Sequence, residues 1–178
     1  MKTIPTSKRA LVVAIALLTG SAAFVCQAKD ISLSAAKLVM AAATEHARAV
    51  HAPGGAIAIV DAGGSVVLLE RLEGSFPAAS DVSIGKARTA AAFRKPTRVF
   101  EDTVNGGRFT MIAVAQVTHF TPLQGGVPIV IGGEVVGAIG CSGAASAKQD
   151  DEIAQFAADA IAKPGVTAKP GATAKKGE

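Results

Sequence analysis

The spacing of apolar and polar residues along the chain changes several times, and each change marks a predicted element. Between Ser32 and His51 the apolar residues recur every three or four positions, which is the period of a helix with one packed face. Ser34 is the expected N-cap, because its hydroxyl can accept from a backbone N–H of the first turn. Pro53-Gly54-Gly55 is expected to end the helix.

Two pairs of β-rich runs are each joined by a double glycine. Gly63-Gly64 separates the first pair and Gly132-Gly133 the second, and adjacent glycines supply the positive φ angles of a tight hairpin turn. The pattern therefore predicts two antiparallel hairpins. Their strands are residues 56–61 with 65–71, and 127–131 with 134–141.

The rest of the patterned region predicts three helical segments and one more strand. A helix is expected from Ser80 to Phe93, and a short helical turn from Pro96 to Val104. Ser146 and Gln149 have the spacing of a capping box and begin a last helix that ends at about Ala162. The apolar stretch 109–123 is rich in β-branched residues, which favours a strand from Ile112 onward.

This order of elements predicts an α+β fold, a single antiparallel sheet flanked by helices. Residues 29–162 form the predicted domain, which is long enough to bury one core. Residues 1–28 have the plan of a signal peptide: Lys2, Lys8 and Arg9, then a short apolar run, then small residues before Ala28. We expect a periplasmic or secreted protein with no transmembrane segment after cleavage. Residues 163–178 are expected to be a disordered basic tail.

Composition and charge remove several classes of function. The predicted domain carries 11 basic and 13 acidic residues, so the basic pI of 9.3 comes from the two ends and gives no nucleic-acid footprint. The absence of Trp and Tyr argues against a base-stacking platform. After cleavage only Cys141 remains of two cysteines, and such a lone thiol is buried, intermolecular or functional.

Three histidines are the candidate metal ligands. His46 lies on the apolar face of the first predicted helix, His51 at its end, and His119 beside Phe120. Their spacing does not match a structural zinc site, but a single neutral imidazole is enough to bind haem iron. The alternative is that His46 is a packed core or interface residue.

A dense group of cations follows on the second predicted helix and the turn after it. These residues form either a solvated helix face or a cradle for carboxylates or phosphates. They are Lys86, Arg88, Arg94, Lys95 and Arg98.

Several separated blocks of the sequence, in the same order, resemble the GlcG/HbpS family. The blocks are VDAGGSVV at 60–67, RLEG at 71–74, GKARTAAAF at 85–93, GGVPI at 125–129 and GAIGCSGA at 137–144. The resemblance implies a profilin-like sheet flanked by helices and assembly into homo-oligomers. The family includes secreted haem-binding proteins, some credited with haem degradation, a domain of corrinoid adenosyltransferases, and the glycolate-operon protein.

The signal-peptide pattern predicts export, and with it the resemblance implies an exported haem-binding protein that stores, senses or degrades haem. His46 is the first candidate iron ligand, with His51 and His119 as the others, and Lys86 and Arg88 are the expected partners of the haem propionates. The alternative is an enzyme or accessory protein that acts on a small carboxylate, with Lys86 and Arg88 as an anion clamp.

Overall fold

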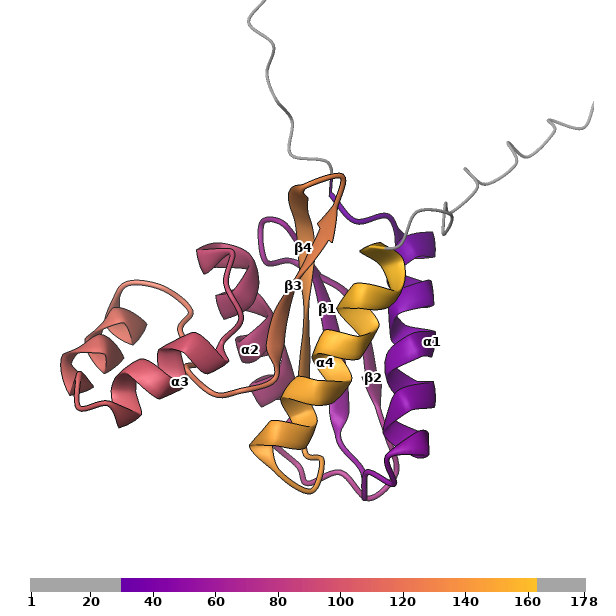
Figure 1. Ribbon diagram of the computed structural model, residues 1–178, viewed down its shortest axis with the longest axis horizontal. Coiled ribbons are helices and arrows are strands. Elements are labelled where there is room, and N and C mark those ends of the chain that lie inside the picture. The colour runs from indigo at the N-terminus through magenta and orange to yellow at the C-terminus, as the bar shows by residue number, and fades with distance from the viewer. Residues whose placement is uncertain (1–29, 163–178) are drawn as a thin grey trace, which may run out of the picture.

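The computed structural model describes residues 30–162, which form one four-stranded antiparallel sheet with helices on both faces (Figure 1). The strand order is β2-β1-β4-β3, so each hairpin is a pair of neighbours and β1 pairs with β4 at the centre. The predicted signal peptide and basic tail lie outside the described residues. The elements are α1 (Leu33–Ala49), β1 (Ala56–Asp61), β2 (Val66–Arg71), α2 (Ala79–Phe93), α3 (Arg98–Asn105), the 3₁₀ helix η1 (Phe109–Gln116), β3 (Gly126–Ile131), β4 (Glu134–Ser142) and α4 (Ala147–Ala162).

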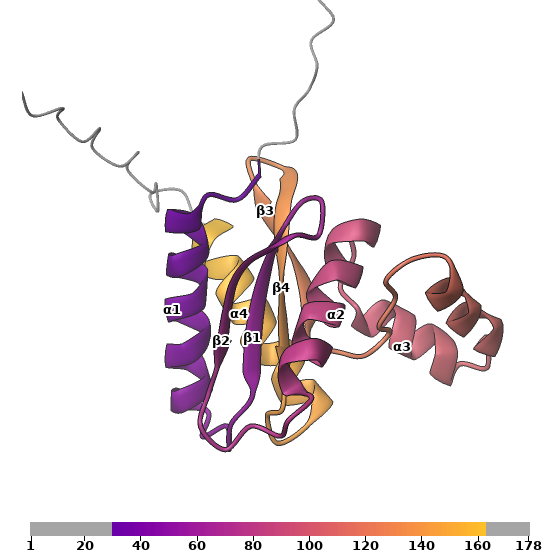
Figure 2. The ribbon, with the colours of Figure 1, turned by 180° about the vertical axis from the view of Figure 1, so that it is seen from behind.

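The sheet separates two unequal cores because its side chains alternate between the faces. Ile57 and Ile59 of β1 point into the larger core under α1 and α4. Ala58 and Val60 point into the smaller core under α2. Figure 2 shows α2 on the face opposite to α1 and α4. The predicted α+β class and both hairpins are confirmed.

The α2 face is built from small residues, so this helix lies close against the sheet. Ala87, Ala90 and Ala91 meet Ala138 of β4, and all four are buried. Gly140 of β4 has no room for a side chain, because an added Cβ would lie 2.7 Å from the backbone nitrogen of Ala87. These alanines and Gly140 thus allow a close helix–sheet contact.

Two predictions for the helix ends are corrected or refined. The N-cap of α1 is Ser32 and not Ser34, since the Ser32 hydroxyl accepts from the backbone N–H of Ala35 at 3.2 Å. At α4 the Ser146 hydroxyl accepts from the backbone N–H of Gln149, as predicted, and the Gln149 side chain accepts from the backbone N–H of Ala145.

Within residues 30–162, none of the helices combines the length and the apolarity that crossing a membrane requires.

The predicted strand from Ile112 is wrong: this segment is the 3₁₀ helix η1. Together with α3 it forms an arm, residues 98–123, that stands away from the sheet (Figures 1 and 2). The base of the arm packs on α2 through the rings of Phe93, Phe100 and Phe120, whose centroids lie 5.1 to 5.5 Å apart. With no strand beside it, the β-branched segment has no ladder to join, and local backbone hydrogen bonds give the helical turn instead.

Candidate functional site

Lys86 does not face solvent as the sequence suggested but crosses from one layer of the protein to the other. Its ammonium donates to Asp150 Oδ2 at 2.9 Å and to the backbone carbonyl of Cys141 at 2.8 Å. The side chains of Lys86 and Asp150 are only 3% and 9% exposed. Because both groups are buried and matched, this is a structural ion pair. Lys86 is therefore not available to bind a propionate or another anion.

The route of the Lys86 side chain depends on Gly125. This residue has a φ of 110°, and an added Cβ would lie 2.8 Å from Asp150 Cβ and 3.1 Å from Lys86 Nζ. A side chain here would therefore push into the ion pair. The glycine block at 125–126 that stood out in the sequence thus has a packing role.

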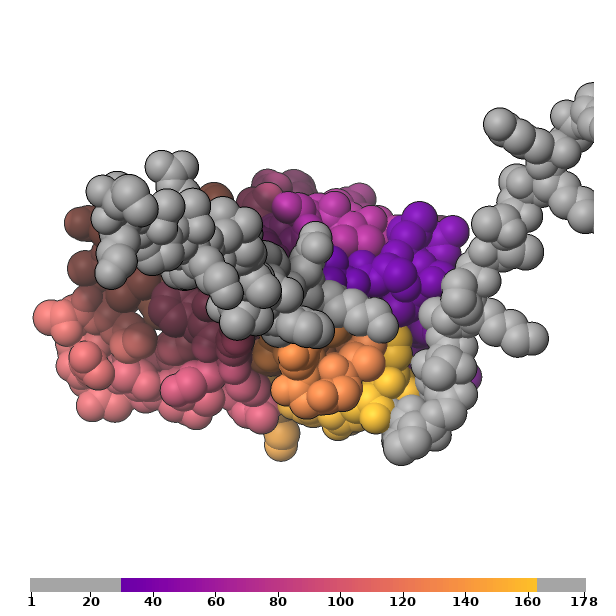
Figure 3. Space-filling model, turned by 90° about the horizontal axis from the view of Figure 1, so that it is seen from above, coloured from indigo at the N-terminus to yellow at the C-terminus, as the bar shows by residue number. Residues whose placement is uncertain are grey.

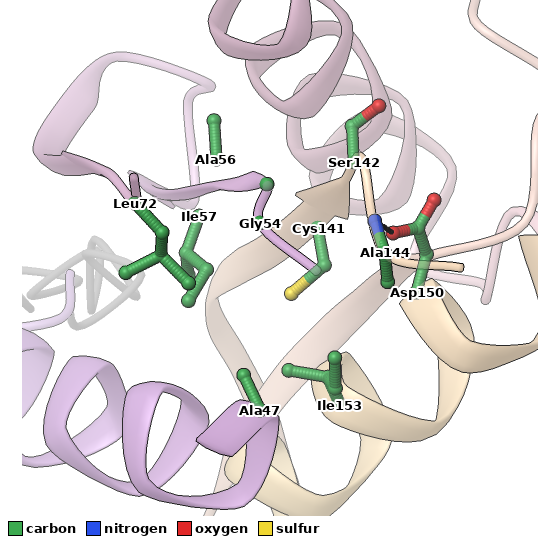
Figure 4. Close-up of a pocket in the computed structure, with 11 residues that line it drawn as sticks. Ala47, Gly54, Ala56, Ile57, Leu72, Cys141, Ser142, Ala144, Asp150 and Ile153 are labelled. Atoms are coloured by element: carbon green, nitrogen blue, oxygen red, sulfur yellow. Dashed lines mark hydrogen bonds between the residues drawn. The ribbon is translucent and has the colours of Figure 1, made fainter. Parts of the chain in front are cut away.

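The backbone carbonyl of Cys141 accepts from the Lys86 ammonium, but the Cys141 side chain points away from this ion pair, into the larger core under α1 and α4. Figure 4 shows its sulfur directed toward Ala47 and Ile153, in a cavity of about 10 Å³. Burial raises the pKa of the thiol well above its ordinary value of 9.0, and the nearby Asp150 carboxylate acts in the same direction. Of the three roles open to this cysteine, the structure supports a buried, protonated thiol.

His46 lies between α1 and α4, where its ring stacks on Phe156 with centroids 4.0 Å apart. Its Nε2 is 3.5 Å from a Glu152 carboxylate oxygen, and 17% of its side chain is exposed. The shallow groove beside it is bordered by the carboxylates of Asp151, Glu152 and Asp159 and by one ammonium, that of Lys148. This acid-rich border disfavours an anionic ligand.

The structure brings Arg88 and His119 together, and these are two of the five predicted site residues. They line one hollow of about 300 Å³ with residues 63–65 of the β1–β2 turn, Ala92 and Thr118. Arg88 Nε donates to the carbonyl of Gly64 at 3.1 Å, so the turn holds the guanidinium in place. A guanidinium has five N–H donors, and the terminal nitrogens remain for a ligand carboxylate. We call this the Arg88–His119 hollow.

His46 and His51 do not contribute to this hollow. His46 lies on the sheet face opposite to α2. His51, whose φ is 54°, lies in the loop between α1 and the first residue of β1. The hollow lies at the other end of that strand. The remaining cations of the predicted patch are also dispersed. Arg98 pairs with Asp151 at 2.8 Å, and Arg94 borders a different hollow between α4 and β3.

Sequence reasoning did not identify the backbone and hydroxyl groups of the Arg88–His119 hollow. Gly64, Ser65 and Thr118 reach it from two loops that are more than fifty positions apart. The available signal is the double glycine at 63–64, whose pattern predicts a hairpin turn but not a ligand site. Within residues 30–162 there is also no cluster of three or more His, Cys, Asp or Glu side chains that could bind a metal ion.

Comparisons with known proteins agree with this architecture. The family model described as "Haem degrading protein HbpS-like" matches residues 31–159. Protein GlcG of Escherichia coli K12 is 41% identical over 86 residues, which are 48% of this chain and 62% of GlcG. The chain thus matches less than two thirds of that relative.

Two solved structures extend the similarity to the fold. A crystal structure of a PduOC–haem complex superposes with a TM-score of 0.66 at 28% identity, covering 74% of this chain and 95% of that one. A double mutant of HbpS from Streptomyces reticuli superposes with a TM-score of 0.69 at 24% identity, covering 90% and 99% of the two chains. Because the family model matches nearly all of the described residues, the chain belongs to the HbpS-like family.

Proposed function

We propose that this protein is an exported haem-binding protein and that the Arg88–His119 hollow is its haem site. The observation that carries the proposal is the pairing of an imidazole with a guanidinium in one hollow that has no carboxylate in its lining. Haem needs an iron ligand and a partner for its propionates, and these two side chains can supply both. The PduOC–haem structure supports the same class of ligand, because that relative binds haem.

The fit of haem to this hollow follows from its chemistry and its size. His119 is exposed, so an iron atom can reach its ring without rearrangement of the core. A hollow of about 300 Å³ lies at the lower end of the range typical of ligand sites, so one chain alone leaves part of a haem uncovered. When bound, haem supplies the redox and oxygen chemistry, while the protein supplies ligation, orientation and charge.

Export is the second part of the proposal, and it rests on the sequence of residues 1–28. The charged segment, the short apolar run and the small-residue boundary are those of a secretory signal. N-terminal sequencing of the protein from the periplasm or the medium should begin at Lys29. Recovery of the uncleaved chain from the cytoplasm would contradict export without affecting the haem proposal.

The haem proposal is tested by titrating the purified chain with haemin and following the Soret band. We expect His119→Ala to abolish the bound spectrum, because the iron loses its protein ligand. His51→Ala, a matched change at a distant exposed histidine, should leave the spectrum and affinity unchanged. Loss of the band in His46→Ala with a normal band in His119→Ala would instead place the iron in the groove beside α1 and α4.

The alternative ligand for the same hollow is a small carboxylate, because a single guanidinium can bind one carboxylate group. Calorimetric titration with glycolate separates the two possibilities. Saturable binding of glycolate that is lost in Arg88→Gln, together with no spectral change on haemin addition, would support the alternative and rule out haem.

A further inference from the structure

The shallow groove beside α1 and α4 carries more negative than positive charge. Its volume is about 470 Å³, and Glu152 and Asp159, seven positions apart, lie along it on the same side of α4. A third carboxylate at its border, that of Asp151, already pairs with Arg98. Among the described residues that line the groove, Lys148 supplies the one ammonium. This groove, which we call the α4 groove, therefore favours a cationic occupant.

The α4 groove also contains an aromatic ring that is half exposed. Phe156 is 49% exposed, and its ring stacks on that of His46 with an interplanar angle of 7°, which holds it against α1. In the part of the chain that the structure describes, His46 Nε2 is buried without a hydrogen-bond partner, so it leaves the neighbouring Glu152 carboxylate unengaged. The Glu152 side chain is 54% exposed and lies one turn from Phe156. The groove thus offers an apolar surface and a carboxylate next to each other.

The segment that follows α4 has the complementary charge. Residues 163–178 contain four lysines and one glutamate, and they lie outside the described residues. α4 ends at Ala162, about one turn after Asp159, so the segment leaves the helix at one end of the α4 groove. Figure 3 shows α4 in yellow beside α1 in indigo, at the end of the molecule opposite to α3. A cationic segment is therefore tethered directly at the groove.

The sequence of this segment provides a reversal and a matching length. Pro164-Gly165 has the residue types of the two central positions of a type II turn, which reverses a chain. Glu152 and Asp159 are about 10 Å apart along α4, because a helix rises about 1.5 Å per residue. An extended chain from Val166 to Lys169 also spans about 10 Å. Pro170-Gly171 then repeats the turn dipeptide, so residues 166–169 are the part that matches the groove.

We propose that residues 163–169 fold back along the α4 groove of their own chain, with Val166 on the Phe156 ring and Lys169 beside the Glu152 carboxylate. Val166 is the one large aliphatic residue of the segment, so it is the side chain that removes the ring from water. The tether gives the segment an effective concentration on the order of millimolar at the groove, so a few weak contacts are enough. A segment without a core of its own can order in this way on a complementary surface. The contact is independent of the proposed haem site, which lies on the α2 side of the sheet.

The contact is tested by fluorescence, because the chain contains no Trp and no Tyr and Phe156→Trp therefore introduces a single reporter in the groove. The protein is the full chain in a Cys26→Ser background. We expect acrylamide to quench the indole about twofold more slowly than it does when Val166→Asp/Lys169→Glu is added, because the segment covers the ring. At about 1 M salt, where the Debye length is about 3 Å, this difference should shrink. Circular dichroism should show equal helix content in both proteins.

A matched control and a charge exchange test the register. Lys175→Glu/Lys176→Glu removes two charges of the same segment beyond Pro170-Gly171 and should leave the quenching slow. Glu152→Lys alone should make quenching as fast as in Val166→Asp/Lys169→Glu, because it repels the lysines. Glu152→Lys/Lys169→Glu restores opposite charges at the two positions and should recover slow quenching. A purely structural effect of either substitution would not be repaired by the other.

Three outcomes would overturn the contact. The first is equal quenching with and without Val166→Asp/Lys169→Glu, and the second is a charge exchange that recovers nothing. The third is recovery of slow quenching when the Val166→Asp/Lys169→Glu reporter chain is refolded with an excess of wild-type chain, or when oligolysine is added to the wild-type reporter chain with fast quenching before the addition. That result would give the groove to another copy or to an external cationic partner. None of these measurements involves haemin, so a failed contact leaves the proposed function standing, and a failed haemin titration leaves the contact standing.

Discussion

The ammonium of Lys86 and the carboxylate of Asp150 lie 2.9 Å apart and join the helix on one face of the sheet to a helix on the other. Asp150 Oδ1 also accepts from the backbone N–H of Ala144 at 2.9 Å, so one carboxylate both pairs with Lys86 and holds the loop before α4. The sequence gives no sign of this pairing, since the two residues are 64 positions apart.

Breaking this pair should strongly destabilise the protein. We expect Lys86→Met to lower the free energy of unfolding by about 3 to 5 kcal/mol, because the Asp150 carboxylate is left buried without its counter-charge. Urea denaturation measures the change. Arg98→Met, which removes the more exposed Arg98–Asp151 pair, is the matched control and should cost about 1 kcal/mol or less. If the two variants lowered the free energy of unfolding equally, burial of the Lys86–Asp150 pair would not add to the cost of breaking it.

The buried thiol of Cys141 should make stability depend on alkaline pH. Burial raises the pKa of Cys141 above its ordinary 9.0, so above that pH the unfolded chain has lost a proton that the folded chain keeps. The free energy of unfolding therefore falls as pH rises. Between pH 9 and 10 the wild type should lose about 1 kcal/mol more than Cys141→Val, as measured by urea denaturation at each pH. Parallel curves for the two proteins would contradict a protonated thiol.

Gly125 should tolerate a side chain much less well than another glycine with a similar backbone. Gly125 and Gly107 have φ angles of 110° and 98°, but only Gly125 has atoms within 4 Å of an added Cβ. We expect Gly107→Ala to cost about 1 kcal/mol from backbone strain, and Gly125→Ala at least about 3 kcal/mol from strain plus overpacking. Thermal or urea unfolding of the two variants gives the comparison. A cost at Gly125 no larger than at Gly107 would mean that the ion pair can move aside.

Arg88 should contribute binding energy by its charge more than by its size. A hydrogen bond to a charged group contributes about 1.5 to 3 kcal/mol, so we expect Arg88→Gln to weaken haemin binding by about tenfold or more. Added salt should reduce the affinity of the wild type more than that of the variant. Arg94→Gln, a cation of the same predicted patch that borders another hollow, is the control and should bind like wild type. Equal losses at both positions would indicate a diffuse electrostatic effect.

Local patterns predicted most of the secondary structure because the forces that decide it are local. The double glycines predicted both hairpins, the three-to-four spacing of apolar residues predicted α1, and the capping box at Ser146 and Gln149 predicted α4. Local patterns failed for segment 109–123, where a strand was predicted and a 3₁₀ helix is found. Its β-branched residues favour a strand, but β-propensity is expressed only when a neighbouring strand is present, and here the four strands are complete without it.

The candidate site shows the same division between local and tertiary information. The candidate residue types, a few histidines and a group of cations, are visible in the chain, as are the family blocks that led to haem. Which of these residues meet depends on the fold. It paired Lys86 with Asp150, stacked His46 on Phe156, and left Arg88 and His119 beside one hollow. The physical reason is that burial and pairing depend on which strands and helices become neighbours, and those contacts join residues tens of positions apart along the chain.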